Sequence, residues 1–263
     1  QPDTYEQSPT AATMVLSGLM VKMGLFGLIR WVLPVVPDAA YAWGDLVMSM
    51  SIIGIIYASI IAIQQDDLKR LVAYSSIAHM GLMAATKLGY QGVLVQMFNH
   101  GINIIGLWIV VELIERQFGT RKLSELGGLA QKAPGLTALL VIIALANIAL
   151  PLTNSFVGEF MMFAGIWTSG VTKYNMVFTA LAGIGIILAA VYTLTMIQKI
   201  FYGSTNNLTA NAREVNNNER FALGVIVLLI VILGVYPQPL LNLSNNFVDG
   251  LLSEIKVSYQ LVK

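Results

Sequence analysis

The chain has 263 residues, of which 56% are hydrophobic and 11% are charged, and its mean hydropathy is +0.72. Soluble proteins carry about 25% charged residues, so this composition predicts a polytopic membrane protein. The net charge of +1, without a cluster of Lys and Arg, argues against a nucleic-acid partner. The absence of Cys excludes disulfides, thiolate metal sites and cysteine nucleophiles.

Seven apolar segments, each long enough to span a bilayer or nearly so, follow one another along the chain. We place these spans near residues 10–33, 45–64, 71–87, 91–114, 136–168, 175–201 and 220–236. The spaced leucines of residues 237–263 indicate an amphipathic helix at the membrane interface. The predicted fold is an all-α, polytopic transmembrane helix bundle over residues 1–236, followed by an interfacial C-terminal tail.

The basic residues predict an orientation. One side of the predicted bundle holds Lys69, Arg70, Arg116, Arg121, Lys122, Lys132, Lys199, Arg213 and Arg220. The other side holds Arg30, Lys87, Lys173, Lys256 and Lys263. Because cytoplasmic loops carry the excess of Lys and Arg, we expect the N-terminal end to be cytoplasmic and the C-terminus external. The first ten residues, QPDTYEQSPT, resemble a loop rather than a signal peptide, and we expect earlier helices to be missing.

Lys22 is the only charge in the run TAATMVLSGLMVKMGLFGLI, from Thr10 to Ile29. A helix of about 20 residues spans the hydrocarbon core of a bilayer, so Lys22 lies far from both ends. A lysine at the centre of such a helix costs about 2.5–3.5 kcal/mol. Its side chain either snorkels to an interface or serves a function, and we predict a functional role supported by a hydrated cavity or a charged partner.

The segment ALANIALPLTNSFVGEF predicts a discontinuous helix. Pro151 removes a backbone donor and clashes with the preceding turn, so we expect the helix to break there. Broken helices place ion sites near the membrane midplane in transporters, which makes Glu159 a candidate proton or cation site. The compatible alternative is a carboxylate stabilised by the dipole at the start of the resumed helix.

Two histidines lie within predicted spans. His100 has Gln96, Asn99 and Asn103 nearby on its helix, and imidazole can accept and donate protons near neutral pH, as a proton relay requires. The alternative is a buried His satisfied by its polar neighbours. His79 is the weaker candidate because helix packing explains it nearly as well.

The remaining charges favour structural roles. Residues 66–67 and 69–70 are expected to form a solvated cap at the membrane surface. The sequence shows no nucleotide-binding loop, no nucleophile–base arrangement and no metal-ligand cluster, so we expect neither a cofactor nor a metal.

Several motifs resemble the antiporter-like subunits of respiratory complex I. They are SPTAATMVLSGLMVKMGLFGLIRW, DDLKRLVAYSSIAHMG, MFNHGINIIGLW, TRKLSELGGLAQKAP and ALANIALPLTNSFVGEF. The glutamate in GEF and the ELGGL loop are most similar to the chain M (chain 4) type of NADH-quinone oxidoreductase. These subunits consist of two inverted helix repeats, and the resemblance implies that this chain corresponds to the C-terminal half. It also implies that Lys22 is a central lysine, that His100 lies on the connecting route and that Glu159 is the terminal residue.

The resemblance implies a proton-translocating subunit of the respiratory chain, driven by electron transfer in other subunits, with neighbouring antiporter-like subunits as partners. The implied location is the bacterial inner membrane. No redox or quinone site is expected in this chain. The alternatives are a subunit of a multisubunit sodium/proton antiporter or a membrane-bound hydrogenase, and a structural membrane scaffold.

Overall fold

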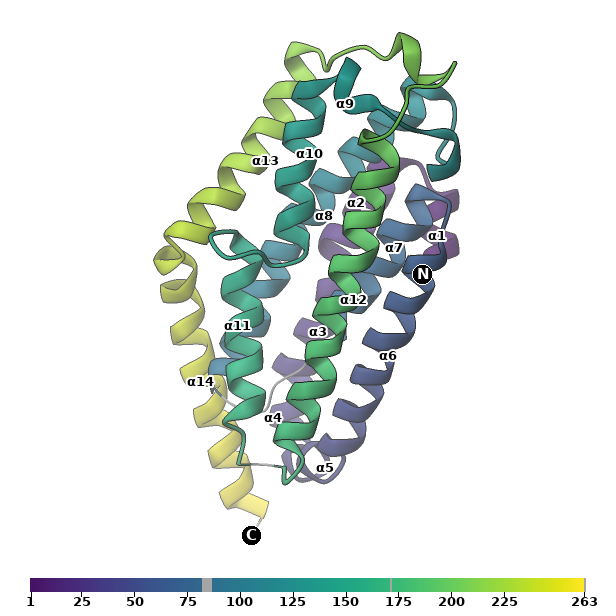
Figure 1. The fold of residues 1–263 in the computed structure, drawn as a ribbon. Helices are drawn as coiled ribbons and strands as arrows, with labels where there is room; N and C mark the ends of the chain where they lie inside the picture. Colours follow the sequence, from purple (N-terminus) through teal and green to yellow (C-terminus); the bar gives the residue numbers. More distant parts are fainter. Residues whose placement is uncertain (82–86, 171, 263) are drawn as a thin grey trace.

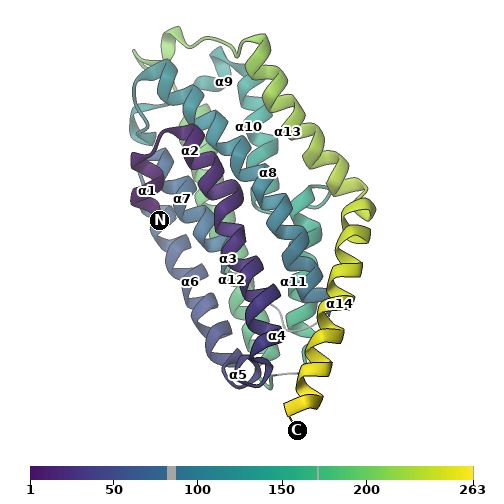
Figure 2. The same cartoon turned by 180° about the vertical axis from the view of Figure 1, so that it is seen from behind.

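The computed structural model describes residues 1–81, 87–170 and 172–262, and the described part is a bundle of helices (Figures 1 and 2). Within these described ranges, five helices are long and apolar enough to cross a membrane: Thr10–Val35, Gly44–Gln64 (α6), Tyr90–Phe118, Asn175–Phe201 (α12) and Asn217–Val235 (α13). The third of these belongs to α8, which begins at Lys87. Shorter helices complete the bundle, so the predicted all-α polytopic fold is confirmed.

The first long helix is continuous but irregular. It consists of α2 (Thr10–Val15), α3 (Val21–Gly27) and α4 (Leu33–Val35), with π-helical turns η1 (Leu16–Met20) and η2 (Leu28–Val32) between them. The other short elements are α1 (Pro2–Gln7), α5 (Pro37–Ala42), α7 (Leu68–Met80), η3 (Leu123–Glu125), α9 (Leu129–Lys132) and η4 (Thr209–Asn211). The predicted span 71–87 coincides with α7 up to Met80, and residues 82–86 lie outside the described part.

The predicted span 136–168 is two helices. α10 (Pro134–Asn147) ends before Pro151, and α11 (Asn154–Trp167) resumes after it. Ala149 and Leu152 in the connection have positive φ angles of 54° and 75°, in the left-handed region. Residues other than glycine rarely adopt this backbone region, so the two helices are separated by a true break in the helix rather than joined at a kink. The predicted discontinuous helix is confirmed.

Polar side chains are buried within the apolar core of the bundle, and many large apolar side chains lie on its surface. Large apolar side chains such as Leu19 and Trp31 are 62% and 65% exposed on its surface, whereas polar residues including Asn99, His100 and Asn103 are buried. A protein surrounded by water has the opposite distribution. The arrangement fits a chain whose outer surface contacts lipid or other apolar helices.

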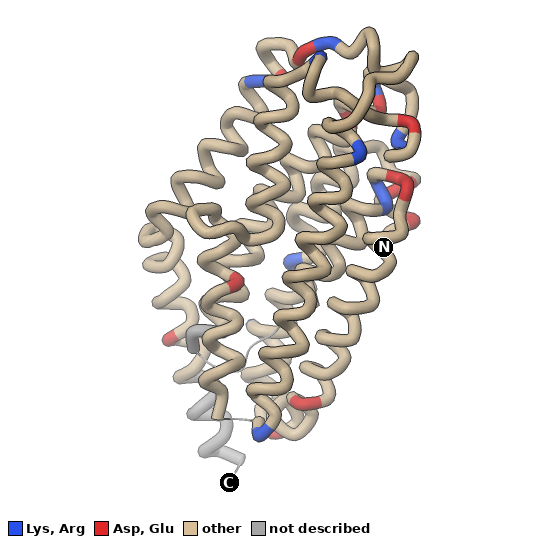
Figure 3. Tube along the Cα trace, viewed as in Figure 1, with Lys and Arg blue, Asp and Glu red and all other residues tan. Residues whose placement is uncertain are grey.

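Charged residues gather at the end of the bundle where α9 lies (Figure 3). There Asp67 is the N-cap of α7, and its side chain accepts a 3.0 Å hydrogen bond from the backbone N–H of Arg70. Lys69 is buried and pairs with Glu115 at 3.0 Å. The expectation of a solvated Lys69 was therefore wrong, because the end of α8 covers it with a carboxylate.

The side chain of Glu214, which is distant in the sequence, caps the N-terminus of α10. Its carboxylate accepts hydrogen bonds of 2.7 Å from the N–H of Gly135 and 3.0 Å from the N–H of Leu136. Partial burial acts to raise the pKa of Glu214, but the N–H groups of Gly135, Val215 and Leu136, with Arg220 nearby, hold this pKa below its usual value. The loop before α13 thus supplies the helix cap that α10 lacks locally.

Glu214→Gln is expected to lower the stability of the full-length protein by about 1 kcal/mol at neutral pH, the usual effect of losing a helix cap. A carboxyl group whose pKa is lowered by folding stabilises above its unfolded pKa and loses that effect as pH falls through its folded pKa. The melting-temperature difference between variant and wild type should therefore shrink in acid. A difference that stays constant down to acidic pH would contradict the charged cap.

The C-terminal helix α14 (Gln238–Val262) continues the path of α13 along the side of the bundle (Figures 1 and 2). Gln91 of α8 attaches it, donating to the carbonyl of Leu241 at 3.1 Å and to the side chains of Ser244 at 3.3 Å and Asn245 at 3.1 Å. The interfacial location of this segment stays a prediction.

Candidate functional site

Lys22 lies inside the bundle, with only 6% of its surface exposed. Its ammonium group donates to the carbonyl of Ser17, within the π-helical turn η1. Trp108 of α8 donates a 2.7 Å hydrogen bond to the hydroxyl of Ser17. In the part of the chain that the structure describes, Lys22 forms no ion pair, so it does not snorkel to a charged surface but stays among polar groups of the interior.

Two glycines bring the helix of Lys22 against α8. A Cβ atom on Gly101 would lie 3.0 Å from the carbonyl oxygen of Gly18, and one on Gly18 would lie 3.0 Å from Ile105. Small residues allow helix backbones to approach closely in membranes. This contact packs the helix of Lys22 against the turn of α8 that contains His100.

His100 is fully enclosed and contacts α7. Its Nε2 lies 3.3 Å from the hydroxyl of Ser76, and its Nδ1 is buried without a hydrogen-bond partner among the described residues. The ring of His79 lies beside it, with ring centroids 5.4 Å apart and planes at 69°. The two histidines, which the sequence places on different helices, thus pack together, His100 buried and His79 partly buried.

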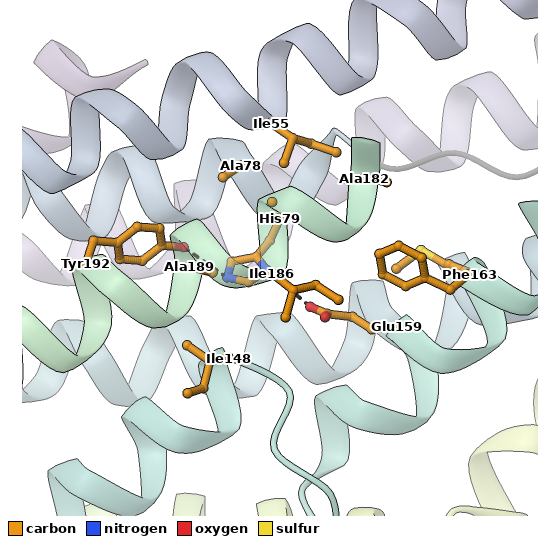
Figure 4. A pocket seen from close by; sticks show the side chains of 12 residues that line it. Ile55, Ala78, His79, Ile148, Glu159, Phe163, Ala182, Ile186, Ala189 and Tyr192 are labelled. Atoms are coloured by element: carbon orange, nitrogen blue, oxygen red, sulfur yellow. Dashed lines mark hydrogen bonds and ion pairs between the residues drawn. The ribbon is translucent and has the colours of Figure 1, made fainter. Parts of the chain in front are cut away.

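His79 contacts Glu159 directly. Nδ1 of His79 lies 3.2 Å from Oε1 of Glu159 (Figure 4). Gln96 of α8 donates a 3.2 Å hydrogen bond to the same oxygen. From the sequence, His79 was the weaker candidate of the two histidines. In the structure His79 lies between Glu159 and His100. Only the packing of α7 against α8 and α11 reveals this position.

Glu159 and His79 line a small cavity together with Tyr192 and apolar side chains (Figure 4). The cavity has a volume of about 40 Å³. A buried water needs about 10–15 Å³ on this measure and two to four polar partners. The cavity therefore has room for water next to the carboxylate, as proton exchange requires.

Three amides of α8 hold the resumed helix α11. Besides Gln96, Asn99 donates to the carbonyl of Asn154 at 2.7 Å and Asn103 donates to the hydroxyl of Ser155 at 2.8 Å. Their spacing along the chain places these amides on one face of α8. Glu159 lies in the second turn of α11, beyond the first turn in which the helix dipole acts most strongly. Its polar contacts are with His79 of α7 and Gln96 of α8.

Two site residues were not identified from the sequence. The hydroxyl of Tyr192 on α12 lies 3.4 Å from Nε2 of His79 and donates to the hydroxyl of Ser75 at 3.1 Å. Asn147, the last residue of α10, donates to the same hydroxyl at 2.9 Å. A tyrosine in an apolar helix gives no signal of its own, whereas Asn147 just before the predicted break was visible as a polar residue in an apolar run.

Among the described residues, no group of three or more His, Cys, Asp or Glu side chains is placed to hold a metal ion. The candidate site consists of Lys22, His100, His79 and Glu159, together with the hydroxyl and amide groups that contact them.

Comparisons with known proteins place this geometry in a family. Residues 1–188 match the family described as NADH:quinone oxidoreductase/Mrp antiporter, TM. The NADH-quinone oxidoreductase subunit M of Rickettsia prowazekii is 36% identical over 257 residues, which cover 95% of this chain and 51% of the relative. That of Escherichia coli K12 is 34% identical over 257 residues, which cover 95% of this chain and 50% of the relative. The chain spans about half the length of the curated relatives it matches.

Solved structures share the fold. A chain of respiratory complex I from Thermus thermophilus with bound NADH has a TM-score of 0.82 and 27% identity, over 92% of this chain and 52% of that chain. A chain of the Mrp complex from Dietzia sp. DQ12-45-1b has a TM-score of 0.85 and 17% identity, over 98% of this chain and 56% of that chain. At the latter identity the likeness concerns the fold alone. Because the family match covers most of the chain, this integral membrane protein belongs to the NADH:quinone oxidoreductase/Mrp antiporter transmembrane family.

Proposed function

We propose that this chain is the proton-translocating part of an antiporter-like subunit of the M type in NADH-quinone oxidoreductase, driven by electron transfer in other subunits. The observation that carries the proposal is a series of enclosed ionisable groups: the buried Lys22 on a helix that packs against α8 at Gly101, then His100 of α8 beside His79, and His79 in contact with Glu159. It ends one turn and a half into a helix that resumes after a break, beside a cavity that can hold water. The relatives named subunit M support the assignment.

Each group in the line suits a different step. An ammonium in a low-dielectric interior responds to charge changes nearby, so a charge moving in a neighbouring subunit can make Lys22 take up or release its proton. Imidazole accepts at one nitrogen and donates at the other, which lets His100 and His79 carry a proton between helices. Glu159 receives the proton at the cavity, where water connects it to one side of the membrane.

The partners we propose are the neighbouring antiporter-like subunits and the lipid bilayer, and the proposed location is a bacterial inner membrane. The charged end of the bundle near α9 holds Lys69, Arg70, Arg116 and Arg121, with Lys122 beside them. Because cytoplasmic loops are rich in Lys and Arg, we assign this end to the cytoplasm and the far end, near α5, to the outside.

The test uses the full-length protein in its assembled complex, in sealed vesicles that contain a pH-sensitive dye. NADH and quinone are expected to drive acidification in sodium-free buffer. His100→Gln cannot be protonated near neutral pH and is expected to slow acidification by at least roughly tenfold, as loss of a positioned proton carrier does. Unchanged acidification in this variant would contradict the relay.

The main alternative function is that of a sodium/proton antiporter subunit, because the fold is similar to that of a chain of the Mrp complex. That function requires proton movement that depends on a sodium gradient and not on NADH. Acidification that needs sodium and persists without NADH would replace the proposed function with this one.

A further inference from the structure

His79 is held at both ring nitrogens by groups from two other helices. Nδ1 lies 3.2 Å from Oε1 of Glu159 on α11, and Nε2 lies 3.4 Å from the hydroxyl of Tyr192 on α12. Figure 4 shows the ring between these two side chains. A neutral imidazole carries one proton and accepts at its other nitrogen, so its neighbours determine which nitrogen faces Glu159 without a proton.

Ser75 determines where the proton of Tyr192 points. The Tyr192 hydroxyl donates a 3.1 Å hydrogen bond to Oγ of Ser75, and Nδ2 of Asn147 donates a second one of 2.9 Å. An amide nitrogen only donates, and a hydroxyl oxygen accepts at two positions. In this arrangement Ser75 accepts from both groups, and the Tyr192 proton points at Ser75 rather than at His79.

These hydrogen bonds indicate which ring nitrogen of His79 carries the proton. Because its own proton points at Ser75, the oxygen of Tyr192 accepts from His79, so Nε2 carries a proton. In the neutral ring, Nδ1 then presents its lone pair to Glu159. Because two lone pairs repel each other, the 3.2 Å contact between Nδ1 and Oε1 then requires one proton between them, bound either to the carboxyl group or to the ring.

The other groups around His79 form no further hydrogen bond with its ring among the described residues. α8 contributes the ring of His100, at a centroid distance of 5.4 Å, and α6 contributes the apolar Ile55 to the cavity wall. On α7 itself, Ser76 contacts His100. Among the residues that the structure describes, the titratable groups that face His79 are thus Glu159, Tyr192 and His100.

We propose that Tyr192 is a positioning residue whose hydroxyl, anchored on Ser75, keeps a proton on Nε2 of His79 and makes Nδ1 the nitrogen that exchanges with Glu159. In that exchange the O–H bond of Glu159 breaks and an N–H bond forms at Nδ1, giving a carboxylate and an imidazolium, and the reverse step restores the neutral pair. The proposal rests on the proton relay of the proposed function and adds the group that gives it direction.

The central variant is Tyr192→Phe, which keeps the ring and removes only the hydroxyl. In the assembled complex in vesicles, it is expected to pump about 3- to 10-fold more slowly per complex, the effect of one lost hydrogen bond. Its pH–rate profile should also move to lower pH, because the imidazolium of His79 loses the oxygen that accepts its Nε2 proton. A structural defect alone would lower the rate without moving the profile.

Ser75 supplies a second, independent variant. Ser75→Ala leaves His79 as the acceptor for the Tyr192 proton and should reproduce the slow pumping, whereas Ser75→Thr retains a hydroxyl and should restore it. In the Tyr192→Phe background, Ser75→Ala should add no further loss, since Ser75 acts through Tyr192. The matched control is Thr195→Val, which removes a partly buried hydroxyl from α12 at a position that lines neither of the two cavities next to Tyr192.

Additive losses from the two substitutions would overturn the proposal, as would a wild-type pH–rate profile in Tyr192→Phe. Failure of the proposed function looks different: Glu159→Gln would then pump like the wild type. An inactive Glu159→Gln beside a fully active Tyr192→Phe would remove the positioning role and leave the relay in place.

Discussion

Glu159→Gln in the full-length protein is expected to slow proton pumping of the assembled complex by at least roughly tenfold, because a positioned proton-transfer group typically contributes 10²–10⁴-fold. Glutamine has the shape of glutamate and can still accept the hydrogen bond from Gln96, so the helix contacts persist. It cannot bind or release a proton next to His79. The measurement is dye-detected acidification of vesicles, divided by the amount of assembled complex.

The matched control for this prediction is Glu112→Gln. Glu112 lies on α8 toward the charged end of the bundle and does not line the cavity of Glu159. We expect this variant to pump like the wild type. Equal losses in both variants would indicate a general effect of removing a carboxylate, and normal pumping in Glu159→Gln would contradict its place in the relay.

Lys22→Met is expected to stop pumping while leaving the complex at least as resistant to heat as the wild type. A buried ammonium opposes folding because it loses its hydration, and an apolar side chain of similar length removes that penalty, which is about 2.5–3.5 kcal/mol for a central membrane lysine. Loss of function without loss of stability separates a functional lysine from a structural one. Pumping rate and thermal unfolding are measured on the same preparation.

Lys22→Arg makes the same prediction sharper. Arginine keeps the positive charge but stays protonated at any accessible pH, so it cannot pass a proton to His100. We expect it to be as inactive as Lys22→Met, and Lys132→Met, which removes an exposed charge at the end of α9, to be active. An active Lys22→Arg would show that Lys22 provides charge only and releases no proton.

The long elements of the fold were visible in the sequence. Continuous apolar runs and the positions of prolines predicted helices whose ends agree closely with α6, α12 and α13, since a segment in lipid has to satisfy its backbone internally and therefore forms a helix. The break near Pro151 followed from the missing backbone donor. Charges inside apolar runs, Lys22 and Glu159, were conspicuous for the same reason.

The ranking of the histidines was decided by packing. His79 and His100 are on separate helices, and nothing in their spacing along the chain shows that their rings lie side by side. The burial of Lys69 against Glu115 was likewise hidden, because the sequence places them 46 residues apart (115 − 69) and only the packing of α7 on α8 joins them.

The sequence by itself determined that this chain is a membrane helix bundle with a broken helix and a few ionisable groups at depth, since hydrophobic runs and prolines act locally. Only the tertiary structure decided which of these groups touch. Close contacts at Gly18 and Gly101 bring the Lys22 helix to α8, and the hydrogen bonds of Tyr192 orient His79 toward Glu159. Side-chain contacts between helices depend on how the helices pack, and that arrangement is a property of the whole bundle.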